Sequence, residues 1–146
     1  AIPMNPELLA LAENSDPKAV DLMMDFAHGP SGHFGGHPVP GLYHLNTGSM
    51  LVQSKEIKDT LGVDFRACEN YTNGFEAAKR LDLPTLSILA DKDRMCRLKD
   101  GQKLADHIKG SEVHVIKNCG HMMLLEEADQ TLAILKKFIL DNYPIS

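Results

Sequence analysis

Two side chains suited to acid–base chemistry follow two apolar runs that have the composition of buried strands. Asp93 comes shortly after residues 85–90, and His121 comes shortly after residues 112–116. Catalytic groups of α/β sheets gather at the carboxyl ends of the strands. The two residues are therefore candidates for the acid and base of a nucleophilic triad, in which the carboxylate orients the imidazole and stabilises the imidazolium. Spacing alone equally allows a second interpretation, in which Asp93 caps a turn and His121 is a surface histidine.

The elements around this pair predict a βαβα unit. A helix is expected over residues 99–108, with Leu98, Leu104 and Ile108 as its apolar contacts, between the strands 85–90 and 112–116. An amphipathic helix is expected over residues 127–142, and its apolar side comprises Leu132, Leu135, Phe138 and Ile139. Two parallel strands do not form a stable sheet by themselves, so the pattern indicates the edge of a larger one.

Short helices broken by loops are expected before residue 83. Asn5 and Asp16, each followed by proline, indicate two helix starts, and Gly29 is expected to end the second helix. Residues 28–49 hold six glycines, three prolines and four histidines, which predicts a long loop. Further short helices are expected around residues 50–60, 65–71 and 74–81.

Residues 83–143 resemble the C-terminal part of the α/β-hydrolase family. The segment LPTLSILADKD at 83–93 is similar to the strand that leads to the triad acid, with Ala90 where glycine is usual. The segment CGHMMLLE at 119–126 resembles the closing G-H-x-x-x-x-E segment. The resemblance implies that Asp93, rather than Asp91, is the triad acid and that His121 is the triad histidine. It also implies a helical cap or lid over residues 1–82 and a C-terminal βαβα part of the core over residues 83–146.

The nucleophile of that family is missing from the sequence. It lies in G-x-S-x-G on a turn between a strand and a helix, and this motif does not occur in the chain. Ser31 comes nearest but follows a helical pattern, and Ser49 fits less well. Cys96 or Cys119 could be proposed instead, although Cys119 is expected to pack at a strand end. The chain therefore looks like a fragment, and we expect negligible serine-hydrolase activity from it alone.

Composition excludes several other classes of function. The net charge is −5 and no basic cluster occurs, so a nucleic-acid partner is not expected. No apolar run approaches the roughly 18 residues that a membrane span requires. Three cysteines, an odd number, argue against a disulfide framework and predict a cytoplasmic protein. No cysteine and no patterned carboxylate accompanies His28, His33, His37 and His44, so neither a metal nor a cofactor is expected.

Two hypotheses of function follow. In the first, the chain is the C-terminal segment of a hydrolase that acts on an ester or similar small acyl substrate, and it pairs with a missing N-terminal half or with itself. In the second, it is a non-catalytic binding or self-association module derived from the same fold. The arrangement of Asp93 and His121 discriminates them, because an enzyme segment requires the two side chains within hydrogen-bond reach.

Overall fold

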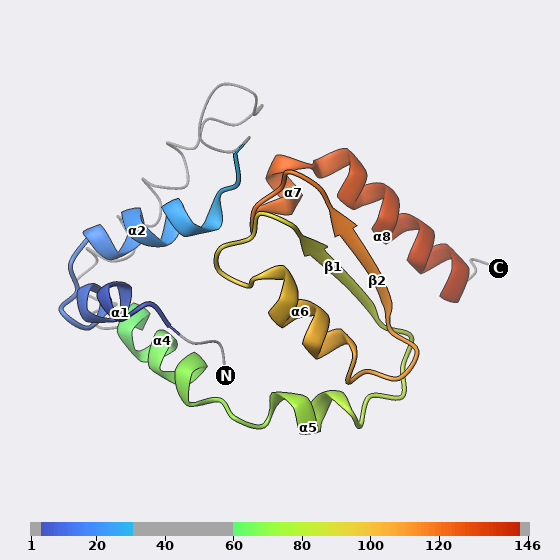
Figure 1. Cartoon of the computed structure of the whole chain (residues 1–146), viewed down its shortest axis with the longest axis horizontal. Coiled ribbons are helices and arrows are strands. Elements are labelled where there is room, and N and C mark those ends of the chain that lie inside the picture. The colour runs from blue at the N-terminus through green and yellow to red at the C-terminus, as the bar shows by residue number, and fades with distance from the viewer. Residues whose placement is uncertain (1–3, 31–59, 144–146) are drawn as a thin grey trace.

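The computed structural model describes residues 4–30 and 60–143 of the chain, and its helices and strands follow one another as a helical N-terminal part and a βαβα C-terminal part (Figure 1). The elements are α1 (Pro6–Glu13), α2 (Lys18–Ala27), α4 (Thr60–Asn70), α5 (Gly74–Ala78), β1 (Leu86–Ala90), α6 (Leu98–Ala105), β2 (Glu112–Ile116), α7 (Met123–Glu126) and α8 (Ala128–Asn142).

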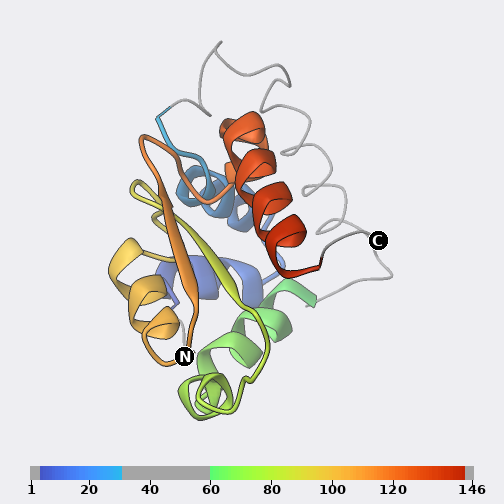
Figure 2. The same ribbon diagram turned by 90° about the vertical axis from the view of Figure 1, so that its right-hand side faces the viewer.

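The two strands form a parallel pair, as the sequence predicts. Their register runs from Leu86 opposite Glu112 to Ala90 opposite Ile116. Figure 2 shows α6 on one side of the strands and α8 on the other. Side chains alternate between the faces of a strand, so Ile88 joins the core that includes Ile134 of α8, while Leu89 lies against Gly101 of α6.

A second apolar core joins the N-terminal helices. Its buried residues are Leu8, Ala12, Ala19 and Phe65, which come from α1, α2 and α4. The helix start predicted at Asn5 is confirmed, since its side-chain oxygen accepts hydrogen bonds from the amides of Glu7 at 2.9 Å and Leu8 at 3.1 Å.

Several helix predictions need correction. The helix expected to reach residue 108 ends at Ala105, and its inner face is made of small residues, so that Leu104 is 42% exposed. On α8, two residues of the expected apolar side, Leu132 and Ile139, are exposed. The short helix α7 was not expected. The helix expected at 65–71 begins earlier, at Thr60, and the one predicted over 50–60 lies almost wholly outside the described residues.

Gly29 does not end α2 in the way that the sequence suggests. The helix closes at His28, whose backbone is extended, and Gly110 is the glycine with a positive φ among the described residues. The reason for a glycine at position 29 is a close backbone contact, described below. None of the helices in the described ranges is both long and apolar enough to cross a lipid bilayer.

Candidate active site

The loop after β1 holds Asp93 in a fixed, buried position. The Asp91 amide donates to the carbonyl of Ile116 at 3.1 Å and the Lys92 amide to that of Cys119 at 3.0 Å, so the acid loop is bound to the end of β2. One carboxylate oxygen of Asp93 accepts the amides of Met95 and Cys96, each at 2.8 Å. The side chain therefore closes its own turn, and Asp93 is only 8% exposed.

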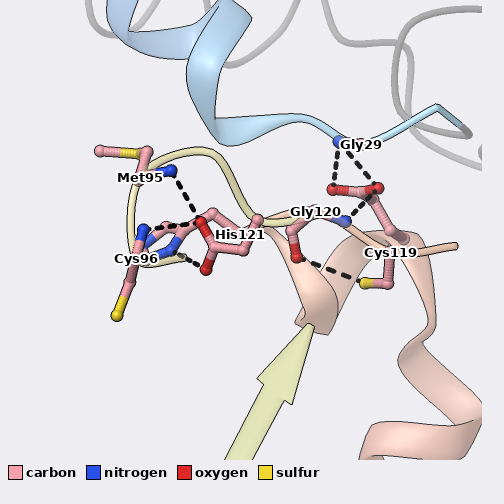
Figure 3. A network of polar contacts seen from close by, with 8 residues as sticks. Gly29, Met95, Cys96, Cys119, Gly120 and His121 are labelled. Carbon is pink, nitrogen blue, oxygen red and sulfur yellow. Dashed lines mark hydrogen bonds and ion pairs between the residues drawn. The ribbon is translucent and has the colours of Figure 1, made fainter. Parts of the chain in front are cut away.

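His121 meets the second oxygen of that carboxylate. Its Nδ1 lies 2.9 Å from Asp93 Oδ2 (Figure 3). An ionised carboxylate has no hydrogen to give, so Nδ1 must be the donor, and Nε2 of the neutral ring keeps its lone pair. The side chain of His121 is 43% exposed, whereas that of Asp93 is 5% exposed. The imidazole is therefore within reach of another reactant.

Asp91, the rival acid, has a different role. Its Oδ1 accepts the amide of Asn118 at 2.7 Å, where the backbone adopts a left-handed φ of 55°. Asn tolerates this conformation better than most residues. Asp91 thus stabilises the turn that leads toward His121, while Asp93 contacts the imidazole itself.

The contact with Asp93 changes the acidity of the histidine. The hydrogen bond to Asp93 raises the pKa of His121 above its usual value, against the opposing effect of burial. Stabilisation of the imidazolium is the property that a general base requires when it takes a proton from a nucleophile.

The two nearby cysteines lie in surroundings that disfavour a thiolate. Burial raises the pKa of Cys119 to about 12, and Cys119 is fully buried in the core beside Ile116. Burial also raises the pKa of Cys96, with the charge of Asp93 adding to the effect. Because the thiolate is the reactive form, neither cysteine has the environment of an activated nucleophile.

The other candidates from the sequence fall mainly outside the described part of the chain. Ser31, Ser49, His33, His37 and His44 all belong to the undescribed range 31–59. His28 is described and nearly buried, with Nδ1 2.8 Å from the carbonyl oxygen of Met24. Among residues 4–30 and 60–143, no three metal-binding side chains gather as a metal site would require.

Sequence reasoning missed one residue at this site. The carboxylate of Glu126 accepts backbone hydrogen bonds from Gly29 and Gly120, each at 3.0 Å. The sequence signal for this residue was the G-H-x-x-x-x-E pattern of the segment 119–126, in which Glu126 is the closing glutamate. Its partner Gly29, 97 residues away along the chain, could not be read from that segment.

Sequence comparison finds relatives over less than half of the chain. Over 64 residues it is 31% identical to a proline iminopeptidase of Lactobacillus crispatus (strain ST1), a match that covers 44% of this chain and 22% of that protein. A proline iminopeptidase of Lactobacillus acidophilus is 33% identical over 63 residues, 43% of this chain and 21% of that protein. No family model matches the chain.

Structural comparison extends the similarity to nearly the whole chain. A thermophilic esterase superposes with a TM-score of 0.74 and 26% identity, over 97% of this chain and 53% of that one. The 2-hydroxy-6-oxo-6-phenylhexa-2,4-dienoate hydrolase of Rhodococcus sp. strain RHA1 gives a TM-score of 0.72 at 21% identity, over 94% of this chain and 51% of that one. The chain thus spans about half the length of the solved structures that it matches, and less of the curated relatives.

Proposed function

Since this chain is a relative of the α/β-hydrolases and has the fold of their C-terminal portion, we propose that it supplies the acid and the histidine of a hydrolase that acts on an ester or similar acyl substrate. The observation that carries the proposal is the 2.9 Å contact between Nδ1 of His121 and Oδ2 of the buried Asp93. The non-catalytic alternative gains no such support, because it predicts two side chains that point apart.

The proposed mechanism assigns one step to each group. Asp93 accepts a hydrogen bond from Nδ1–H without taking the proton, and so holds the ring with Nε2 toward the nucleophile. His121 then takes the proton of the nucleophile as it attacks the acyl carbon, and returns it to the leaving group when the tetrahedral intermediate collapses. The nucleophile itself would come from a segment other than residues 1–146, since G-x-S-x-G does not occur in them.

The helical segment of residues 1–82 is proposed to act as the cap. Support comes from α2, whose last residue Ala27 accepts the amide hydrogen of His121 at 2.8 Å. A cap in this position would border the imidazole and restrict which acyl groups approach it.

Pairing is part of the same proposal. The exposed apolar residues of α8, among them Leu132 and Ile139, would be covered by the other half of the hydrolase fold or by a second copy of this chain. A cytoplasmic location is also proposed, in keeping with three cysteines that are all free thiols.

The test is hydrolysis of p-nitrophenyl acetate by the product of the natural gene that encodes this chain. His121→Ala and Asp93→Asn should each lower kcat by about a thousandfold to ten-thousandfold. His107→Ala is the control, because the half-buried His107 makes its contacts outside the proposed site: its ring stacks on Phe75 at 4.6 Å, and its Nδ1 lies 2.7 Å from the carbonyl oxygen of Lys103. Unchanged kcat in His121→Ala would refute the proposal.

Covalent labelling tests whether the nucleophile lies within this chain. Residues 1–146 alone should not react stoichiometrically with diisopropylfluorophosphate, because the motif for an activated serine is missing. Labelling of one serine of this chain would place the nucleophile within it and overturn that part of the proposal.

A further inference from the structure

The carboxylate of Glu126 joins two segments that are far apart in sequence, directly beside His121. Both of its oxygens accept the amide hydrogen of Gly29 at 3.0 Å, and Oε2 also accepts that of Gly120 at 3.0 Å (Figure 3). A charged acceptor makes these bonds stronger than bonds between neutral groups. Glu126 therefore ties the loop after α2 to the loop that presents the histidine.

The two glycines allow this contact because they have no side chains. A Cβ atom on Gly29 would lie 2.3 Å from the backbone nitrogen of Gly120, and one on Gly120 would lie 2.1 Å from that of Gly29. Neither glycine has a positive φ, so the need for glycine arises from close approach rather than from backbone conformation. The backbones of the two loops are therefore in direct contact at these glycines.

Further bonds link the end of α2 to both loops of the candidate site. The carbonyl of Ala27 accepts the amides of His121 at 2.8 Å and Met122 at 3.3 Å. On the acid loop, Arg94 Nη1 lies 3.2 Å from Asp25 Oδ2, and its guanidinium stacks 4.7 Å over the ring of Phe26. The end of α2 thus contacts the loop of the acid and the loop of the histidine.

We propose that Glu126 is a positioning residue, which fixes the His121 loop against the end of α2 and thereby holds the imidazole on Asp93. The inference rests on the proposed function, in which His121 is the general base. Hydrogen bonds weaken steeply as distance and angle depart from their optimum. A loop released from Gly29 would consequently lose part of the contact between His121 and Asp93.

The experiment measures His121 directly and needs no enzymatic activity. Wild type, Glu126→Gln and Asp93→Asn are compared by NMR titration of the His121 imidazole and by hydrogen exchange of the Gly120 amide. Glu127→Gln is the matched control, since it removes the same charge from the next residue, whose backbone forms hydrogen bonds with Met123 and Thr131. The titratable and charged groups around this junction include Asp25, His28, Asp91, Lys92, Asp93, Arg94, Cys96, Cys119, Glu126 and Glu127.

We expect Glu126→Gln to move the His121 pKa down toward the value in Asp93→Asn and to speed exchange of the Gly120 amide, whereas Glu127→Gln changes neither. Wild-type values for both readouts in a folded Glu126→Gln protein would overturn the inference. Should Glu126→Gln fail to fold, the same two measurements are made on Glu126→Asp, which keeps the charge but shortens the side chain. The proposed function is contradicted separately if the His121 pKa measured in Asp93→Asn equals the one measured in wild type.

Discussion

Each carboxylate oxygen of Asp93 has its own partner. Oδ1 closes the turn by accepting the amides of Met95 and Cys96, and Oδ2 accepts Nδ1 of His121. The turn restricts rotation of the carboxylate, so the imidazole meets an acceptor that is already oriented. Both interpretations that spacing allowed for Asp93, a turn cap and a partner of His121, are therefore realised by the same side chain.

The raised pKa of His121 makes the stability of the protein depend on pH. Its pKa is above 6.5 in the folded state because of the bond to Asp93, whereas the unfolded chain has the ordinary value of about 6.5. The folded state therefore binds the proton more tightly. The stabilisation is fully present below the unfolded pKa and is lost as the pH rises through the folded pKa.

We accordingly expect wild type to gain stability relative to His121→Gln as the pH falls through the folded pKa of His121 toward the unfolded value of about 6.5. The measurement is the free energy of unfolding in urea at several pH values, taken as the difference between the two proteins so that the other histidines cancel. A difference that stays flat over this range would mean that His121 and Asp93 are not coupled.

At the scale of elements, α7 and α8 are joined by one buried hydroxyl. Thr131 is 2% exposed, and its Oγ1 lies 3.1 Å from the carbonyl oxygen of Met123 and 2.8 Å from that of Glu127. Since α7 ends in Glu126, the threonine stabilises the helix that presents the carboxylate to Gly29 and Gly120.

Thr131→Val should lower the free energy of unfolding by about 1 kcal/mol, because it keeps the shape of the side chain but removes the buried donor. Thr131→Ser, which keeps the hydroxyl and loses a methyl group, is the comparison. Chemical denaturation of both variants measures the effect. The explanation is contradicted if the valine variant proves as stable as wild type.

The contact between the loop after α2 and the histidine loop makes a second prediction about elements. Gly29→Ala would place a Cβ atom 2.3 Å from the Gly120 nitrogen and 2.9 Å from the Cys119 carbonyl carbon. Because these are backbone atoms, the loops must separate, and we expect a loss of about 1 to 3 kcal/mol in the free energy of unfolding.

Gly74→Ala is the control for this substitution. At the start of α5 a new Cβ atom would meet only the Tyr71 ring, at 3.3 Å or more, and Tyr71 is exposed and able to move. Alanine also favours the helix. Thermal unfolding should show a lower Tm for Gly29→Ala and little change for Gly74→Ala; equal Tm values would argue against the close contact.

At the scale of the whole molecule, the described part of the chain exposes much apolar surface along α8. Leu132 is 63% exposed, Ile139 50% and Leu140 43%, and their spacing places them on one side of the helix. In that same part of the chain β1 pairs with β2 alone, so its other edge is open to further pairing. Surface of this kind is typical of a region that another protein segment covers.

The purified chain is therefore expected to self-associate. Sedimentation equilibrium should give a mass above that of one chain, and Leu132→Lys combined with Ile139→Lys should lower it toward a single chain. Lys136→Arg, on the same helix, is a control that should leave the mass unchanged. A wild-type mass of one chain at every concentration would show that this surface does not drive association.

The sequence by itself determined the order of the C-terminal elements and the two positions that carry the candidate chemistry. Short apolar runs, helix caps and turn residues are local signals, so they located β1, β2 and α8 closely and put Asp93 and His121 after adjacent strands. Local patterns failed on α7 and on the depth of burial of Leu104 and Leu132, which depends on neighbours from elsewhere in the chain.

Only the tertiary structure decided how the site is assembled. It showed that Asp91 binds the Asn118 turn while Asp93 meets His121, and that Glu126 reaches Gly29 across 97 residues. These contacts depend on where the backbone passes close to itself, and no short-range periodicity records that distance. Gly29 illustrates the difference, since its position after a helix predicts a cap, whereas in space it is the point where two loops touch.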